Sequence, residues 1–572
     1  MLKLRRDRGC LPAGRRRGLA EKIFIAVAWP YANGSLHLGQ IVSSQLPADI
    51  LARYHRAKGN RVLMVSGSDQ HGTPITVRAE QEGRSPQEVA AQFHQEFVEC
   101  WQRLGITFDL YTTTGTENHA GVTQDVFLTL LNRGHIYKEN MPLPYCPNER
   151  RFLPDRYVEG TCPYCGYTDA RGDQCDDCGK TLNAAELLEM RCRLCGATPE
   201  IRQSDHFFLR LSAFSDRLRE WVSDKAHWRK AVLNWTLGLL NEGLPDRAVT
   251  RDIEWGVAIP LEGYEDKRIY VWFEAVIGYL SAAKEWAQNS GDPEAWREFW
   301  QDPDCRSYYF LGKDNIPFHT IIWPAMLMGY DGLNLPYDVP ASQYLTMRGS
   351  KVSTSRRWAV WLPDFLSRYD PDPLRYHLSV TMPETSDSDF TWADFVRRNN
   401  DELVATWGNL VHRVLTFTYR HFDGAVPQPG ELDETDRRLL ERAEQSLALV
   451  GEEISLCHFR GGIGAAMAMA QEANRYLEEK SPWRLIRDDR EKAATTLYAA
   501  IGVINGLKTA FYPYMPFTCQ RLHGYLGYDG PVQDGGWQFA LPLPRQPIAP
   551  PEPLFKKLEP QIVEEEEARL GQ

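Results

Sequence analysis

The sequence lacks several features that would place it in other protein classes. It has no run of about 18 apolar residues, so nothing in it predicts a membrane-spanning helix. It has no Gly-x-x-x-x-Gly-Lys-Ser/Thr motif, which excludes a Walker phosphate loop. It also has no internal repeat and no low-complexity domain. These absences leave a globular protein with no predicted contact with a membrane.

The start of the chain is basic, and no apolar stretch follows it. Residues 1–21 form a basic N-terminal extension whose arginines lie between Arg5 and Arg17. Without an apolar stretch, a secretory signal is not expected. A disordered arm or an over-extended start is the simplest interpretation, and a transit peptide or an RNA-touching arm are the alternatives. We therefore expect a cytoplasmic protein.

Length and charge limit the architecture. At 572 residues the chain is too long for one hydrophobic core, and it predicts three or four domains. The net charge of -11 argues against a uniformly basic nucleic-acid binder, although a basic face on an acidic protein can still bind phosphates. The charged C-terminal tail, residues 546–572, contains Glu564–Glu567 and is expected to be a solvated helix or a disordered end.

Four apolar runs rich in β-formers predict buried strands, at residues 22–28, 61–66, 268–273 and 307–311. Glycine, proline, acidic or aromatic residues follow each run. Ligands of open parallel sheets bind outside the carboxyl ends of the strands, so this edge is where a nucleotide site is expected. The cysteines lie between the second and third runs. The pattern predicts an α/β fold, in which a Rossmann-like parallel sheet is split by an insertion.

The rest of the chain has a helical pattern. Amphipathic segments at 401–421, 435–456, 460–480 and 490–511 predict a helical bundle. We expect domain boundaries at the following positions: first half of the Rossmann domain 22–114, insertion with zinc knuckles 115–250, second half of the Rossmann domain 251–340, a connecting region 341–400, and helical domain 401–545.

Seven of the twelve cysteines lie between 146 and 195. The spacing Cys162-x2-Cys165-x9-Cys175-x2-Cys178 predicts a closed, structural zinc site of four thiolates. Cys146, Cys192 and Cys195 could form a second site, but a fourth sulfur is missing. Glu149 could supply an oxygen ligand or be an ordinary surface carboxylate. An exchange of ligands between the two sites also stays open.

Motifs suited to a phosphate-bearing ligand follow three of the predicted strands. Trp29–Gln40 resembles a glycine-containing turn into a helix, where backbone N–H groups and His37 could bind an anion. Residues 67–74 and 312–319 place Asp69, Lys313 and Asp314 at comparable strand ends. Residues 349–357 form a basic, hydroxyl-rich loop suited to closing over phosphates.

Taken together, these motifs resemble those of a known enzyme family. His37-Leu38-Gly39 and, some 300 residues later, Lys351–Ser355 resemble the two signatures of class I aminoacyl-tRNA synthetases. PYANGSLHLG, GSDQHGTPI, FLPDRYVEGTCPYC, YVWFEAVIGY, GKDNIPFHTIIWPAML and SPW, in this order, look like methionyl-tRNA synthetases over about residues 22–545.

The resemblance implies ATP-dependent activation of L-methionine to methionyl-adenylate and its transfer to tRNA(Met). It places methionine at Trp29, Tyr31, Asp69, Trp272, Ala275, Val276, Tyr279 and His319. It places ATP, with Mg²⁺, at His37, Gly39, Gln40, Lys313, Asp314 and Thr354. It assigns catalysis to His37, Gln40, Lys351, Thr354 and Arg356. Without the resemblance, Trp272 and Tyr279 would be interpreted as core residues on a helix face.

Two positions depart from the family pattern. Gln40 stands where the first signature has a second histidine, and Thr354 stands where the loop signature has a second lysine. Lys351, Arg356 or Arg357 could supply the missing charge toward pyrophosphate. That hypothesis fails if alanine at Lys351 and alanine at Arg356 each leave adenylate formation unchanged.

The resemblance also implies that residues 341–400, which carry the loop signature, form a stem-contact region, and that the helical bundle binds the anticodon. The family's contacts correspond to Asn409, Arg413, Pro482 and Trp483, where a tryptophan could stack on an unstacked base. A tryptophan at a Ser-Pro-Trp helix start is otherwise often a hydrophobic staple. No dimerisation module is apparent after the bundle, which favours a monomer.

Two other functions stay open at this point. One is another class I synthetase, for leucine, isoleucine, valine or cysteine. The branched-chain enzymes carry a large editing domain, however, and 572 residues leave little room for it beside the bundle. A zinc-containing RNA-binding protein that has lost catalysis is the other, and Gln40 and Thr354 favour it. Amino-acid-dependent pyrophosphate exchange distinguishes all three.

Overall fold

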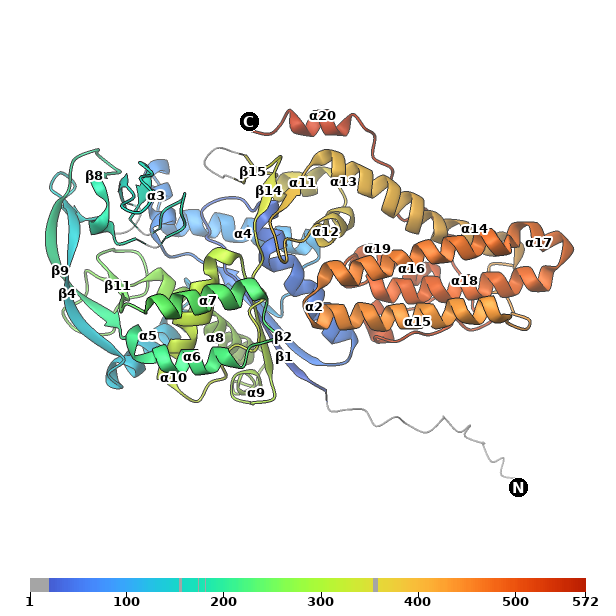
Figure 1. The fold of residues 1–572 in the computed structure, drawn as a ribbon, viewed down its shortest axis with the longest axis horizontal. Coiled ribbons are helices and arrows are strands. Elements are labelled where there is room, and N and C mark those ends of the chain that lie inside the picture. Colours follow the sequence, from blue (N-terminus) through green and yellow to red (C-terminus); the bar gives the residue numbers. More distant parts are fainter. Residues whose placement is uncertain (1–19, 154–156, 173, 181, 353–357, 572) are drawn as a thin grey trace, which may run out of the picture.

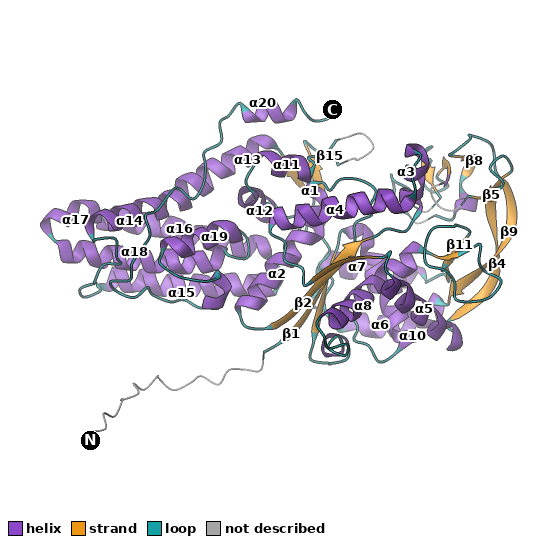
Figure 2. Cartoon of the chain, turned by 180° about the vertical axis from the view of Figure 1, so that it is seen from behind, coloured by secondary structure: helices purple, strands orange, loops and turns teal. Residues whose placement is uncertain are grey.

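A parallel sheet lies at the centre of the catalytic part of the chain. The computed structural model describes residues 20–571 apart from 154–156, 173, 181 and 353–357. The sheet has the strand order β13-β1-β2-β3, and every pairing in it is parallel. Its strands are β1 (Lys22–Val27), β2 (Arg61–Ser68), β3 (Leu110–Thr113) and β13 (Arg306–Phe310). Figure 2 shows β1 and β2 between layers of helices.

Both faces of this sheet are covered. Along β1, Ile23, Ile25 and Val27 belong to one core, which α2 (Leu46–Ala57) and α4 (Pro86–Leu104) help to form. The alternate residues Phe24 and Ala26 belong to a second core on the opposite face, with residues of α5 (Glu117–Asn132), α8 (Val271–Asn289) and α10 (Trp323–Tyr330). A strand buried on both sides must be apolar throughout, which is why the sequence runs were continuous rather than alternating. The predicted Rossmann-like architecture is confirmed.

The prediction of a strand over 268–273 is wrong. Only Arg268–Ile269 forms a strand, β12, and it pairs antiparallel with β11 (Thr250–Arg251) outside the main sheet. The helix α8 begins at Val271 and buries most of its circumference, so its apolar start has no helical periodicity to detect. The fourth strand of the main sheet is instead β3, which has four residues and was not predicted.

The cysteine-rich insertion is built on a long antiparallel pair. β4 (Ile136–Cys146) pairs with β9 (Glu200–Leu209) from Ile136 opposite Leu209 to Tyr145 opposite Glu200. A small sheet of β6 (Val158–Thr161), β7 (Ala170–Arg171) and β8 (Leu188–Cys192) lies between them in sequence, with its own core. Figure 1 shows this arm at the end of the molecule opposite the helical bundle.

Three of the four predicted bundle helices are confirmed to within one residue: α15 (Glu434–Ser455), α16 (Phe459–Lys480) and α18 (Arg490–Phe511). The first one ends where predicted but starts earlier, because α13 (Trp392–Arg398), a π-helical segment (Asn399–Gly408) and α14 (Asn409–His421) form one continuous helix. Two shorter helices, α17 (Pro482–Asp488) and α19 (Pro516–Tyr525), complete this part. Between sheet and bundle lie α11 (Leu362–Arg368), α12 (Pro371–Val380), α13 (Trp392–Arg398) and a sheet of β14 (Leu345–Met347), β15 (Ser350–Lys351) and β16 (Ser388–Phe390).

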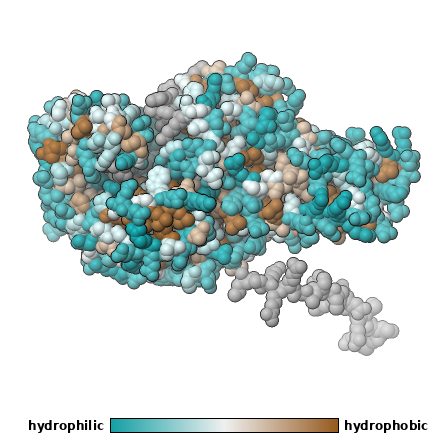
Figure 3. Space-filling model, viewed as in Figure 1, coloured by the Kyte–Doolittle hydropathy of each residue, from teal (hydrophilic) through white to brown (hydrophobic). Residues whose placement is uncertain are grey.

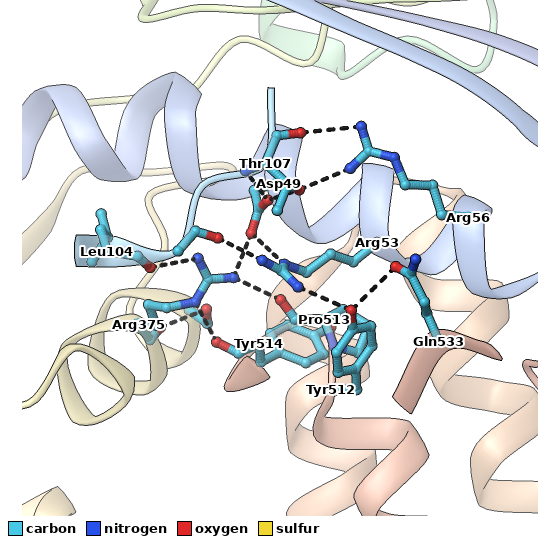
Figure 4. A network of polar contacts seen from close by, with 12 residues as sticks. Asp49, Arg53, Arg56, Leu104, Thr107, Arg375, Tyr512, Pro513, Tyr514 and Gln533 are labelled. Atoms are coloured by element: carbon cyan, nitrogen blue, oxygen red, sulfur yellow. Dashed lines mark hydrogen bonds and ion pairs between the residues drawn. The ribbon is translucent and has the colours of Figure 1, made fainter. Parts of the chain in front are cut away.

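A buried ionic network joins the catalytic part to the bundle (Figure 4). Asp49 of α2 accepts hydrogen bonds from Arg53 Nε at 2.8 Å and from Arg375 Nη2 of α12 at 2.7 Å. The two arginines also donate to the segment that follows α18: Arg53 to the Tyr512 hydroxyl, and Arg375 to the Tyr514 carbonyl oxygen. Asp49 and Arg375 have no exposed side-chain surface. The network therefore fixes α2, α12 and the bundle relative to one another.

The C-terminal tail returns to the catalytic side of the molecule. Its helix α20 (Ile562–Glu567) lies beside α13, and Glu566 accepts hydrogen bonds from Arg368 at 2.8 Å and from the Tyr369 hydroxyl at 2.7 Å. Glu566 is buried, so the expectation of a merely solvated or disordered end is wrong for this residue. Ile562 and Val563 of this helix pack against the core, so α20 is held by apolar contacts as well as by Glu566.

The surface in Figure 3 is largely hydrophilic, with an apolar patch in the region of α7 (Lys230–Glu242), which carries the exposed Trp235 and Leu237. Among the described residues, no helix is long and apolar enough to cross a bilayer.

Candidate active site and metal centre

The carboxyl ends of β1 and β2 meet at one edge of the sheet. Tyr31 and Asp69, which follow these two strands, form a parallel bridge, in which Asp69 N donates to the Pro30 carbonyl oxygen at 2.9 Å. Trp29 lies behind this junction, with its ring against Gly67 and Gly278. A Cβ at either glycine would come within 3.0 Å of that ring, so only glycine admits it. The predicted strand-end site is therefore formed by groups in direct contact.

The turn after β1 holds His37 at the start of a helix. His37 N donates to Gln40 Oε1 at 3.0 Å, and Gln40 N donates to the His37 carbonyl oxygen at 3.0 Å. A Cβ at Gly39 would meet the His37 ring at 3.0 Å, which explains the glycine. Burial lowers the pKa of His37 to about 4, so its imidazole is neutral at physiological pH. Gln40 thus stabilises the turn through its side-chain oxygen, a role that needs no cationic histidine.

The segment that follows the basic loop lies against the His37 turn. His37 forms an antiparallel bridge with Trp361, and Leu38 N donates to the Val360 carbonyl oxygen at 3.3 Å. These partners directly follow the basic loop, residues 349–357. Thr354 and Arg356 lie outside the described residues, and of Lys351 only the backbone, in β15, is described. Val360 and Trp361 therefore bring the chain back to the first signature.

Most of the residues predicted for methionine are linked by direct contacts beside the ends of β1 and β2, and this group of residues is called the slot below. Trp272, Ala275, Val276 and Tyr279 lie on one face of α8, at helical spacing. Trp272 Nε1 donates to the Tyr31 hydroxyl at 3.0 Å and meets the ring of Phe318 edge-on at 4.8 Å. These contacts connect α8 both to the end of β1 and to the segment after β13.

His319 completes the slot from the opposite side. Its Nδ1 donates to the Asn315 carbonyl oxygen at 2.9 Å, which leaves Nε2 to accept from the Tyr279 hydroxyl at 2.7 Å. Burial lowers the pKa of His319 to about 4, and this keeps the ring neutral. The pKa of Asp69 is raised well above its usual range, mainly by burial and secondly by the negative charge of Glu274. The slot is thus apolar and aromatic, with one acidic end.

Lys313 and Asp314 occupy the turn after β13. Lys313 Nζ lies 3.0 Å from Asp387 Oδ1 and 3.7 Å from the centre of the Tyr344 ring, while the Tyr344 hydroxyl donates to Asp314. The lysine is therefore held by a carboxylate and an aromatic face at the rim of the site. Tyr344 and Asp387 were not predicted, because they reach the site from elements remote in sequence.

A cavity of 760 Å³ lies between the catalytic part and the insertion. Trp272 and Phe318 line it from one part of the chain, and Phe208 of β9 and Arg247 of β10 (Arg247–Ala248) line it from the other. Of the residues predicted for methionine, Trp272 alone lines this cavity.

The four cysteines predicted for zinc converge. The sulfur atoms of Cys162, Cys165, Cys175 and Cys178 all lie within 4.8 Å of one another. Two of the separations, 3.6 Å for Cys165–Cys175 and 4.0 Å for Cys162–Cys178, match the roughly 3.8 Å between thiolates at zinc–sulfur distances of about 2.3 Å. The set fits a tetrahedral zinc ion with no position left for water.

The remaining three cysteines form a separate group. Cys146, Cys192 and Cys195 also lie within 4.8 Å of one another. Glu149 contributes its backbone N–H to Cys146 Sγ at 3.5 Å, but no carboxylate of the described residues joins this group. The pairs are therefore not interleaved in the described structure: 162/165 combines with 175/178, and 146 with 192/195.

The predicted anticodon residues also converge, at the far end of the bundle. The guanidinium of Arg413 lies 4.3 Å from the centre of the Trp483 ring. Asn409 precedes Arg413 by four residues and so lies on the same face of α14. Pro482 is the buried first residue of α17, after Ser481 in a left-handed conformation (φ 44°). Trp483 is half-buried rather than fully exposed, and Arg413 covers one face of its ring.

Comparison with known proteins agrees with this geometry. The family model for class I tRNA synthetases (M) matches residues 23–415, and the model for the anticodon binding domain of methionyl tRNA ligase matches residues 426–572. The chain belongs to the methionine–tRNA ligase family. Family membership accounts for both the sheet with its insertion and the helical part.

Individual relatives extend over nearly the whole chain. The methionine–tRNA ligase of Dehalococcoides mccartyi is 59% identical over 553 residues, covering 97% of this chain and 100% of the relative. That of Thermomicrobium roseum is 52% identical over 580 residues, covering 96% and 99%. The solved structure of Mycobacterium tuberculosis methionyl-tRNA synthetase in complex with methionyl-adenylate superposes with a TM-score of 0.77 at 25% identity, covering 93% of this chain and 99% of that one.

Two buried groups beside the slot were missed by sequence reasoning. Glu274 lies between the predicted pocket residues Trp272 and Ala275, and its carboxylate contacts His71, two residues after Asp69. Both lie inside motifs that the sequence had already singled out, GSDQHG and YVWFEA. An acidic residue inside an otherwise apolar run was the available signal.

Proposed function

We propose that this chain is a methionine–tRNA ligase, which activates L-methionine with ATP to methionyl-adenylate and transfers the methionyl group to the 3'-terminal ribose of tRNA(Met). The observation that supports the proposal is the set of contacts among the residues proposed to bind methionine: Trp29, Tyr31, Asp69, Trp272, Ala275, Val276, Tyr279 and His319. Aromatic and apolar side chains suit the flexible, polarizable thioether, and Asp69 suits the α-ammonium.

The nucleotide would lie between the His37 turn and the basic loop. His37, Gly39 and Gln40 present a helix start to the phosphates, where backbone N–H groups and the helix dipole favour an anion. Lys313 and Asp314 would serve the ribose and phosphates from the turn after β13. Thr354 belongs to the loop signature that would close over the triphosphate, together with Lys351 and Arg356.

The reaction requires in-line attack of the methionine carboxylate on the α-phosphorus, with pyrophosphate as the leaving group. No covalent enzyme intermediate is needed, so the contribution of the chain is positioning and neutralisation of charge. His37, neutral because its pKa lies near 4, donates a hydrogen bond rather than a charge to the phosphate oxygens. Positive charge would come from Lys351 and Arg356. Mg²⁺, when bound with ATP, neutralises part of the triphosphate charge.

The helical part would identify the tRNA. Asn409, Arg413, Pro482 and Trp483 lie together, and a tryptophan with an arginine beside it is a platform for an unstacked base with hydrogen-bond donors at its edge. Zn²⁺ at Cys162, Cys165, Cys175 and Cys178 would stabilise the insertion, and a second ion at Cys146, Cys192 and Cys195 would do the same nearby. We propose a monomer that acts in the cytoplasm.

The test is amino-acid-dependent exchange of labelled pyrophosphate into ATP. Purified protein should support exchange with L-methionine and at least a hundredfold less with leucine, isoleucine, valine or cysteine. Exchange with one of those four instead would mean a different class I ligase. Absence of exchange with all amino acids, in protein that still binds tRNA, would favour a non-catalytic RNA-binding role.

A further inference from the structure

A second buried carboxylate is linked to Asp69 through His71. Glu274 lies in the first turn of α8, and its side chain is fully buried. A glutamate at such a position is costly unless both of its oxygens have hydrogen-bond partners.

Only one of those oxygens is occupied by the protein. His71 Nδ1 donates to Glu274 Oε1 at 2.7 Å, while the His71 ring packs edge-on against Trp255 at 5.1 Å. Glu274 Oε2 is buried and has no hydrogen-bond partner among the described residues. The imidazole therefore fixes the orientation of the carboxylate and leaves one oxygen for a donor that the chain does not supply.

One residue contacts both acids. The backbone N–H of His71 donates to Asp69 Oδ1 at 3.2 Å, and its imidazole contacts Glu274. Asp69 is also buried, and the negative charge of Glu274 contributes to raising the pKa of Asp69. A cation close to both acids would offset this repulsion.

We propose that Glu274, held in place by His71, is a second carboxylate for the α-ammonium of the amino-acid substrate, and that it acts together with Asp69. This rests on the function proposed above. The arrangement gives the slot its strongest attraction for a substrate with a free ammonium group, and it disfavours ligands of the same shape that lack one. His71 is a positioning residue, because it acts through Glu274.

Two alcohols separate this role from a structural one. L-Methioninol retains the ammonium group and thioether of methionine, whereas 3-(methylthio)propan-1-ol lacks the ammonium group. Each is measured as an inhibitor of methionine-dependent pyrophosphate exchange, with the wild-type chain, Glu274→Gln, Glu274→Asp and Glu285→Gln. Glu285 is a half-buried acid on the same helix, hydrogen-bonded to Thr112, and it serves as the matched control.

Glu274→Gln should raise the KM for methionine and the inhibition constant of methioninol by about tenfold to a hundredfold, the range for loss of a charge-assisted hydrogen bond. The turnover number should change by less than about threefold, and affinity for the deaminated alcohol should be unchanged. Glu274→Asp should recover part of the loss because it restores the charge. Glu285→Gln should behave as the wild type.

Equal weakening of both alcohols by Glu274→Gln, or no weakening of methioninol, would overturn the proposal and leave Glu274 as a structural group. If Glu274→Gln fails to fold, Glu274→Asp decides alone: selective weakening of methioninol supports the proposal, and equal weakening of both alcohols overturns it. Failure of the underlying function is separate, because it would appear as absent exchange in the wild-type chain.

Discussion

Substitution of Asp49 by asparagine should destabilise the whole molecule, because this one side chain compensates two buried guanidinium groups. Asp49 accepts hydrogen bonds from Arg53, Arg375 and both the backbone and hydroxyl of Thr107. Burial alone would raise its pKa, but the charges of Arg53 and Arg375 outweigh burial and lower the pKa from 3.8 to about 2. At roughly 1.36 kcal/mol per pKa unit, that difference corresponds to about 2.5 kcal/mol of stabilisation by the ionised form.

The cost of Asp49→Asn should exceed this figure. Asparagine leaves Arg53 and Arg375 buried without a negative partner, and breaking a buried ion pair in this way costs about 3–5 kcal/mol. Both arginines keep other acceptors, among them the Gly105 and Pro513 carbonyl oxygens, so the lower end of that range is expected. The network in Figure 4 joins two parts of the chain, so the variant should also separate their unfolding transitions.

Guanidinium chloride unfolding, followed by tryptophan fluorescence and far-ultraviolet circular dichroism, measures the change. Glu294→Gln is the matched control, because Glu294 pairs with Arg297 on the surface and its loss should cost less than about 0.5 kcal/mol. The reasoning is refuted if Asp49→Asn costs no more than this control.

Acid unfolding gives a second readout of the same residue. The folded pKa of Asp49 lies below its ordinary value, so the stabilisation is complete above about pH 4. It is lost as the pH falls through about 2. The free energy of unfolding of the wild type should therefore fall more steeply with pH than that of Asp49→Asn between these limits. The same dependence on pH in both proteins would contradict the assignment.

Other predictions concern the metal, the tRNA and the active-site imidazole. Cys162→Ser should remove one zinc ion per chain, measured by atomic absorption, and an unchanged metal count would mean that the four thiolates do not form the site. Trp483→Ala should lower kcat/KM for tRNA charging about fivefold to a hundredfold, from the loss of base stacking, while methionine-dependent pyrophosphate exchange stays unchanged; loss of both would indicate a structural role. Burial lowers the pKa of His37 to about 4, so this ring stays neutral and exchange between pH 6 and 8 should show no titration that His37→Asn removes.

The sequence predicted those parts of the fold whose residue pattern is determined by one burial environment. Strands at 22–28, 61–66 and 307–311 are apolar throughout because helices cover both faces of the sheet. The bundle helices show a clear period because each has one exposed face. The stretch at 268–273 was wrongly predicted as a strand because α8 is buried on most sides, so its sequence shows neither a helical nor a strand periodicity. The strand β3 was missed because it has only four residues.

The candidate site was predictable as far as motifs reach. The residues proposed for methionine and the cysteine pairs lie in short motifs, and Arg413 beside Trp483 was expected from the family resemblance. The partners Tyr344, Asp387 and Trp361 were not predicted, since their role depends on how separate elements pack and not on neighbouring letters. Glu274 shows the same limit on a smaller scale: its letter was within a motif, but its unoccupied oxygen is visible only in three dimensions.

The docking of α20 has a consequence for how the chain is made. Glu566 is synthesised almost 200 residues after Arg368 and Tyr369, which it binds. A ribosome elongates the chain from its N-terminus, and domains fold in that order. The region around α11 must therefore fold first without this acid and close its contacts later. Chains interrupted during translation before α20 would keep the pair of Arg368 with Asp364 but would leave the Tyr369 hydroxyl without Glu566, which offers quality-control proteases a local difference between unfinished and finished molecules.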